Sequence, residues 1–229
     1  MWGTATMRTG GDDIAQAMAL MGVRPVWATG SQRVDDFEIL PVSLLDRPRV
    51  DVTLRVSGFF RDAFANLIRL FDAAVQAVAA LEEPDDLNPL AAKVRSERAQ
   101  LESQGLAPEL AARQAGWRIF GAKPGAYGAG VQNAIDGRLW QSREDLAEVY
   151  LNWGGYAYGA SDEGTAARGQ FAKRLSQVQA VVQNQDNREH DLLDSNDYYQ
   201  FQGGMLAAVE SLSGEQAASY HGDHSQPDL

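Results

Sequence analysis

The chain has 229 residues, of which 45% are hydrophobic and 22% are charged, and its formal net charge is −11. These values are typical of a folded protein with a substantial core, arranged as one large domain or two small ones. The negative charge disfavours binding to nucleic acid and to anionic membrane surfaces, because both require a positive protein surface. The absence of cysteine excludes disulfides, thiolate nucleophiles and cysteine-ligated zinc or iron–sulfur sites.

No apolar run approaches the ~20 residues that span a bilayer, and the N-terminal stretch MWGTATMRTGGDD lacks the apolar core of a secretion signal. We therefore expect a cytoplasmic protein. Both ends look interrupted. Trp2-Gly3-Thr4 resembles the end of a strand with no strand before it, and the final stretch EQAASYHGDHSQPDL has no helix or strand to close it. We expect the chain to be a fragment of a longer protein.

Residues 1–57 are predicted to form an α/β segment. A helix begins at Asp12 or Asp13 and ends before Gly22, and a short extended piece follows over residues 23–27. The best strands cover residues 37–42 and 50–56, the second with alternating apolar and polar residues. A helix between extended segments indicates a βαβ-like unit. A hairpin arm at residues 33–37 is the alternative, which leaves the strand order open.

Residues 58–214 are predicted to be mainly helical with one late strand, over residues 178–182, and to belong to the same compact unit. Amphipathic spacing and capping residues predict helices over residues 60–81, 89–104, 108–120, 142–153, 170–177 and 195–212. Residues 215–229 are predicted to be a polar, truncated tail. The predicted fold class is α/β, with a small mixed or parallel sheet, a βαβ-like start and a mostly helical remainder.

Two features of the middle of the chain can bind a ligand. Arg61 and Asp62 follow the 50–56 strand at its carboxyl end, where ligands bind in open α/β sheets; a plain ion pair is the alternative. The glycine-rich loop GAKPGAYGAG, residues 121–130, can cradle a phosphate or let a flat ligand approach closely. Nucleotide binding is not expected, because the chain has no G-K-[ST] motif. A purely structural loop is the alternative.

The densest polar cluster of the sequence surrounds His190, within VVQNQDNREHDLLDSNDYYQFQGG. In one interpretation, Asp194 caps a helix that begins at Ser195, and the acidic first turn complements the helix dipole. That interpretation leaves residues 184–190 unexplained. In the other, His190 and one carboxylate, Glu189 or Asp191, bind a borderline divalent ion such as cobalt, nickel or zinc.

The other two histidines, His221 and His224, lie in the C-terminal tail. Their H-x-x-H spacing would suit a metal ion on a helix. The neighbouring Gly222 and the polar composition favour a disordered or truncated end instead.

Five stretches carry a resemblance to a known family: WGTATMRTGGDDIAQAMALMGVRPVW, EILPVSLLDRPRVDVTLRVSGFFRDAFANLIRLFD, WRIFGAKPGAYGAGV, YLNWGGYAYG and VVQNQDNREHDLLDSNDYYQFQGGM. In order and spacing they resemble the large subunits of aerobic, ATP-dependent cobaltochelatases and of magnesium chelatases. The resemblance covers residues 2–214. The run NREHDLLDSNDYY is similar to the cobalt branch.

The resemblance implies an internal piece from the C-terminal half of a subunit several times longer, inactive when isolated. It implies an enzyme that inserts Co2+, the substrate metal, into hydrogenobyrinic acid a,c-diamide in cobalamin (vitamin B12) biosynthesis. This subunit is expected to bind the tetrapyrrole and the metal. An AAA+ ATPase and a partner with an integrin-like domain are expected to hydrolyse ATP with Mg2+, which fits the missing nucleotide motif on this chain.

The resemblance also suggests roles for particular residues. The catalytic candidates are Glu189 and His190, the metal ligands are His190 and Asp191, and the substrate contacts are Arg61, Tyr127 and Asn184. Arg61 would bind carboxylates of the substrate, and Tyr127 would pack on the face of the ring. Two alternatives stay open: a non-catalytic scaffold that docks the ATPase partner, and a magnesium-chelatase large subunit that acts on protoporphyrin IX.

Overall fold

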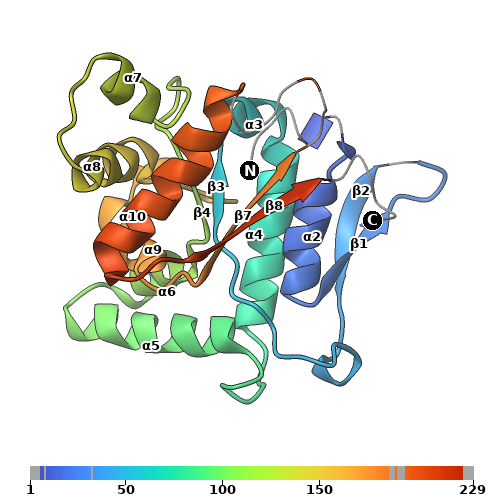
Figure 1. The fold of residues 1–229 in the computed structure, drawn as a ribbon. Helices are drawn as coiled ribbons and strands as arrows, with labels where there is room; N and C mark the ends of the chain where they lie inside the picture. The colour runs from blue at the N-terminus through green and yellow to red at the C-terminus, as the bar shows by residue number, and fades with distance from the viewer. Residues whose placement is uncertain (1–5, 8, 32, 186–188, 190–193, 224–229) are drawn as a thin grey trace.

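The structure is a computed structural model that describes residues 6–7, 9–31, 33–185, 189 and 194–223 (Figure 1). Its helices are α2 (Asp12–Leu20), α3 (Gly58–Ala63), α4 (Ala65–Ala79), α5 (Pro89–Ser103), α6 (Pro108–Gly116), α7 (Val131–Asp136), α8 (Arg143–Gly154), α9 (Arg168–Leu175) and α10 (Gly204–Ser213), with a 3-10 turn η1 (Val42–Leu44) and a π-helical turn η2 (Tyr198–Gly203). Its strands are β1 (Val23–Trp27), β2 (Val34–Ile39), β3 (Leu54–Val56), β4 (Ile119–Gly121), β5 (Tyr156–Tyr158), β6 (Glu163–Ala166), β7 (Ala180–Gln185) and β8 (Ala218–Asp223). The predicted mixed α/β class is confirmed. No helix in these ranges is long and apolar enough to cross a membrane.

The central sheet has the strand order β3-β4-β5-β6, in which β3 and β4 are parallel and the other pairs are antiparallel. Both of its faces are covered by helices. Leu54 and Val56 point into a core with α2 and α4, and Phe120 points into a second core with α8 and α9. Because side chains alternate along a strand, Arg55 faces the side opposite to Leu54 and Val56. The two cores thus lie on opposite sides of one thin sheet (Figure 1).

The N-terminal segment contains an antiparallel hairpin rather than a βαβ-like unit. Residues of β1 pair with β2, with Val23 opposite Ile39 and Pro25 opposite Phe37. The alternative in which residues 33–37 form a hairpin arm is therefore the observed one. The parallel pair lies later, between β3 and β4. The strand expected over residues 50–56 is shorter, because the amides of Arg49 and Val50 bond to the carbonyls of Leu87 and Leu20 outside any sheet.

The helix expected over residues 60–81 is divided into α3 and α4. Ser57 begins α3 by accepting a hydrogen bond from the amide of Phe60 at 3.0 Å. Phe64 then adopts φ −125° and ψ 38°, which is not helical, and α4 restarts behind it. The amphipathic spacing holds in α4, where Phe71, Val75 and Val78 are fully buried.

The C-terminal stretch differs from the predicted polar tail, because residues 218–223 form β8 in parallel with the late strand β7. The helix expected from Ser195 is also altered. Ser195 Oγ accepts a hydrogen bond from the amide of Asp197 at 3.3 Å. The chain then passes through η2 into α10, and Gly214 ends α10 with φ 76°.

Candidate functional site

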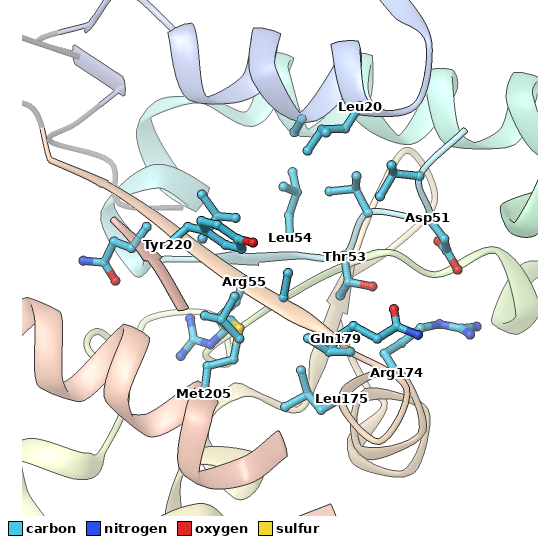
Figure 2. Close-up of a pocket in the computed structure, with 18 of the residues that line it drawn as sticks. Leu20, Asp51, Thr53, Leu54, Arg55, Arg174, Leu175, Gln179, Met205 and Tyr220 are labelled. Atoms are coloured by element: carbon cyan, nitrogen blue, oxygen red, sulfur yellow. The ribbon is translucent and has the colours of Figure 1, made fainter. Parts of the chain in front are cut away.

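A cavity of about 710 Å3 lies between helix α2, the free edge of β3 and the β7–β8 ribbon. Figure 2 shows Leu20 of α2, Leu54 of β3, Leu175 of α9 and Met205 of α10 around the same space. The volume falls within the range of about 300–1,000 Å3 that is usual for small-molecule sites. The cavity exists because β3 is an edge strand, and β7–β8 crosses it without hydrogen-bonding to it.

Three buried polar atoms in this cavity wall have no hydrogen-bond partner among the residues that the structure describes. They are Tyr150 Oη, Gln183 Nε2 and Asn184 Oδ1. Burial raises the pKa of Tyr150 to about 12, so its phenol keeps its proton at neutral pH and can donate a hydrogen bond. Buried polar groups are almost always paired, so such a set in one cavity indicates a ligand site.

Arg55 is a buried cation in the cavity wall, with 2% of its surface exposed. Its guanidinium donates to the carbonyls of Val56 and Gly128, the second at 3.2 Å. The charge lies 5.6 Å from the ring centre of Tyr150 and 5.4 Å from that of Phe201, within the range of cation–π attraction. Burial lowers the pKa of Arg55, yet a guanidinium stays charged in proteins. Arg55 therefore brings a fixed positive charge to an apolar space.

A buried ion network closes one end of the cavity. Arg174 binds Glu97 through both carboxylate oxygens, and Arg118 donates to Asp51 at 2.6 and 3.3 Å. Lys93 lies 3.6 Å from Asp51. Asp51, Lys93 and Arg174 line the cavity, so this network fixes the position of its wall.

The network makes stability depend on pH. Burial by itself raises the pKa of Asp51, but the charge and hydrogen bonds of Arg118 outweigh it, and the pKa lies below its ordinary value of 3.8. A carboxylate with a lowered pKa stabilises the fold above its unfolded pKa, and this stabilisation is lost as the pH falls. We expect Asp51→Asn to be destabilising at pH 7 and less destabilising at pH 3, which is below the unfolded pKa of 3.8, in urea unfolding. An equal effect at both pH values would contradict this assignment.

Arg61 and Tyr127 lie outside this cavity and hold the glycine-rich loop. The Arg61 guanidinium donates to the carbonyls of Lys123 at 2.9 Å and Ala126 at 3.1 Å, and to the Asp62 carboxylate at 2.6 Å. Tyr127 Oη donates to Asp62 at 2.7 Å, and its ring centre lies 5.4 Å from the guanidinium. The Arg61–Asp62 ion pair of the alternative interpretation is present. A role of Arg61 or Tyr127 toward substrate stays a prediction.

Only part of the polar cluster around His190 lies within the described residues. Asn184 is buried in the cavity wall, whereas Glu189 is exposed. His190 and Asp191 lie outside the described residues. Within the described ranges, no group of three His, Cys, Asp or Glu side chains could hold a metal ion. His221 lies on β8 with its ring edge-on to that of Tyr198, whereas His224 lies outside the described residues.

Comparison with known proteins agrees with the resemblance. Residues 1–229 match the family described as CobN/Magnesium Chelatase. The chain belongs to this family. It is 82% identical over 228 residues to the aerobic cobaltochelatase subunit CobN of Pseudomonas aeruginosa, and 61% identical over 227 residues to that of a Sinorhizobium species. It spans 18% of the length of each.

Two further members show how widely this part of the family is shared. The chloroplastic magnesium-chelatase subunit ChlH of Oryza sativa subsp. japonica is 33% identical over 226 residues, which are 97% of this chain and 16% of that protein. The solved catalytic subunit of cobaltochelatase from Mycobacterium tuberculosis is 46% identical, with a TM-score of 0.93. That match covers 100% of this chain and 19% of the other. The fold described above is therefore a recurring part of a longer family protein.

The sequence reasoning missed Gln16, Arg55 and Tyr150 as members of the cavity wall. A signal existed for Arg55, because a charge between Leu54 and Val56 in a short strand points away from their core. For Gln16 and Tyr150, nothing in the local sequence distinguishes a cavity-lining side chain from any other helical residue.

Proposed function

We propose that this chain is part of the tetrapyrrole- and metal-binding subunit of a cobaltochelatase, and that the cavity beside β3 holds the tetrapyrrole. The observation that carries the proposal is a large apolar cavity with a buried cation, Arg55, in a chain 82% identical to a cobaltochelatase subunit. Apolar walls suit the faces of a macrocycle. The higher identity to cobaltochelatases than to the magnesium-chelatase relative favours Co2+ as the substrate metal.

The charges of the cavity wall support an acidic substrate. The cations that line it are Arg49, Arg55, Lys93 and Arg174, whereas its carboxylates are Asp13 and Asp51. Arg49, Arg174 and Lys93 are paired with the carboxylates of Glu83, Glu97 and Asp51, whereas Arg55 contacts carbonyl oxygens and aromatic rings. A tetrapyrrole with carboxylate side chains, as in hydrogenobyrinic acid a,c-diamide, would gain charge-assisted hydrogen bonds there.

Metal insertion requires three changes. The pyrrolic N–H groups lose their protons, the ion loses its water, and the ring bends so that its nitrogen lone pairs face the ion. We expect His190, with Glu189 or Asp191, to hold Co2+ beside the ring and to accept these protons. An AAA+ ATPase and a subunit with an integrin-like domain would hydrolyse ATP and drive the desolvation and distortion. The enzyme would act in the cytoplasm.

Filling the cavity tests where the tetrapyrrole binds. Thr53 lies in the cavity wall beside β3 (Figure 2). In the full-length subunit, we expect Thr53→Trp to weaken tetrapyrrole binding by about tenfold or more, because the indole occupies part of the space that the ligand needs. Fluorescence quenching measures the affinity. Val26→Trp, at an exposed position of β1 outside the cavity, should leave it unchanged. Unchanged affinity in Thr53→Trp would place the tetrapyrrole elsewhere.

A further inference from the structure

Asn184 and Gln16 meet at the end of the cavity that is remote from the ion network. Asn184 Nδ2 donates to Gln16 Oε1 at 2.8 Å. Asn184 belongs to β7 and is 6% exposed, whereas Gln16 belongs to α2 and is exposed at the rim. Both line the cavity. We name this pair the amide corner.

The amide corner has hydrogen-bonding capacity left over. An amide oxygen accepts two hydrogen bonds and an amide nitrogen donates two. Asn184 Oδ1 is buried and accepts none from the residues that the structure describes. Leaving a buried acceptor unpaired is costly, so a ligand that donates to it gains affinity. Beside this acceptor, the Nε2 group of Gln16 offers a donor, so the pair matches a group that carries both an N–H and a C=O.

An acidic side chain, Asp13, lies on the same helix as Gln16 of the amide corner, and burial raises the pKa of its carboxyl group. Asp13 precedes Gln16 by three residues on α2, which places both on one face of the helix. Its carboxylate is 1% exposed, lines the cavity and accepts hydrogen bonds from Thr6 at 3.2 Å and Thr9 at 3.3 Å. A second carboxylate brought to this place by a ligand would be repelled. The cavity-lining cations Arg174 and Lys93 belong to the ion network, where they are paired with Glu97 and Asp51.

We propose that the amide corner binds a primary carboxamide on the periphery of the ligand, whose N–H donates to Asn184 Oδ1, and that it discriminates against a carboxylate there. A carboxylate has no hydrogen to donate, so it would leave Asn184 Oδ1 unpaired and face Asp13. This inference rests on the proposed binding of a tetrapyrrole in the cavity. It names the residues that distinguish a carboxamide from a carboxylate on the periphery of that ligand.

The test compares two probes on the full-length subunit by fluorescence quenching. One probe is a tetrapyrrole with peripheral carboxylates, and the other is the same ring with primary carboxamides at positions of the proposed contact. We expect the wild type to prefer the carboxamide by about five- to a hundredfold, the range of one unpaired buried hydrogen-bonding group. In Asn184→Leu, which removes the acceptor, this ratio should fall to about one.

The matched control is Gln170→Leu. Gln170 donates to Gln114 Oε1 at the same 2.8 Å, so this variant removes an amide–amide hydrogen bond outside the cavity, and the preference should stay as in the wild type. Gln16→Leu, at an exposed position, should lower the preference and keep the fold. Equal binding of both probes by the wild type would overturn the proposal. An equal loss for both probes in Asn184→Leu would also overturn it, because it would indicate a contact with the ring N–H groups. Binding of neither probe would contradict the proposed function itself.

Discussion

Replacing Glu97 with glutamine lowers the free energy of unfolding by about 3–5 kcal/mol, the usual cost of breaking a buried ion pair from one side. Glu97 is 6% exposed, and both of its oxygens accept hydrogen bonds from Arg174, which is 4% exposed. Without the carboxylate, the Arg174 charge stays buried beside the Arg118 guanidinium, and only Asp51 remains to neutralise the two. Urea unfolding of the chain measures the loss.

The same helix provides the control. Glu102 of α5 pairs with Arg98 at 2.8 Å on the surface, with side-chain exposures of 36% and 50%. Glu102→Gln should cost less than about 0.5 kcal/mol, because exposed pairs contribute little. A double variant, Glu97→Leu with Arg174→Leu, should recover much of the loss, since it leaves no uncompensated buried charge at this pair. A cost for Glu97→Gln as small as that of Glu102→Gln would show that the network does not stabilise the cavity wall.

Replacing His190 with alanine is expected to lower cobalt insertion by about 10²–10⁴-fold, the range for loss of a general acid–base group. The assay uses the full-length subunit with the proposed ATPase partner. Imidazole is the side chain that combines binding of a borderline metal ion with proton transfer near neutral pH. Co2+ affinity should fall together with activity.

His224→Ala is the matched control, because it removes a histidine from the C-terminal tail and should change neither quantity. Unchanged Co2+ affinity and unchanged activity in His190→Ala would contradict the assignment. If activity is lost while Co2+ affinity stays as in the wild type, His190 acts in proton transfer and does not bind the metal ion.

The helix boundaries could be predicted from the sequence, because capping residues and their partners lie within one helical turn. Asn88 caps α5 by accepting a hydrogen bond from the amide of Ala91 at 3.0 Å, and Pro89 occupies the first turn, as predicted. Ser142 and Asp145 form the predicted capping box of α8. Such signals can be read from the sequence because both partners are three residues apart.

Strand pairing did not follow from the sequence in the same way. The β1–β2 hairpin and the parallel β7–β8 ribbon depend on partners that local patterns do not specify. The β8 strand reads ASYHGD, which lacks an alternating apolar pattern, and it is held by pairing with β7. The prediction of a polar tail over residues 215–229 was therefore wrong for a physical reason. The hydrogen bonds that stabilise β8 come from backbone groups 38 residues away, as in the pair Ala180–Ala218.

The sequence by itself determined the family resemblance, the mixed α/β class and most helices. It also indicated the segment that begins at Asn184 as a candidate site. Only the tertiary structure decided that Asn184 faces a cavity and that its amide meets Gln16, which lies 168 residues away. It also decided that Arg55 lies within cation–π distance of the rings of Tyr150 and Phe201. Helix caps and amphipathic faces depend on residues that are close along the chain, so a local sequence pattern predicts them. The cavity lies between the edge of one sheet and a separate two-stranded ribbon, and no local sequence pattern predicts that arrangement.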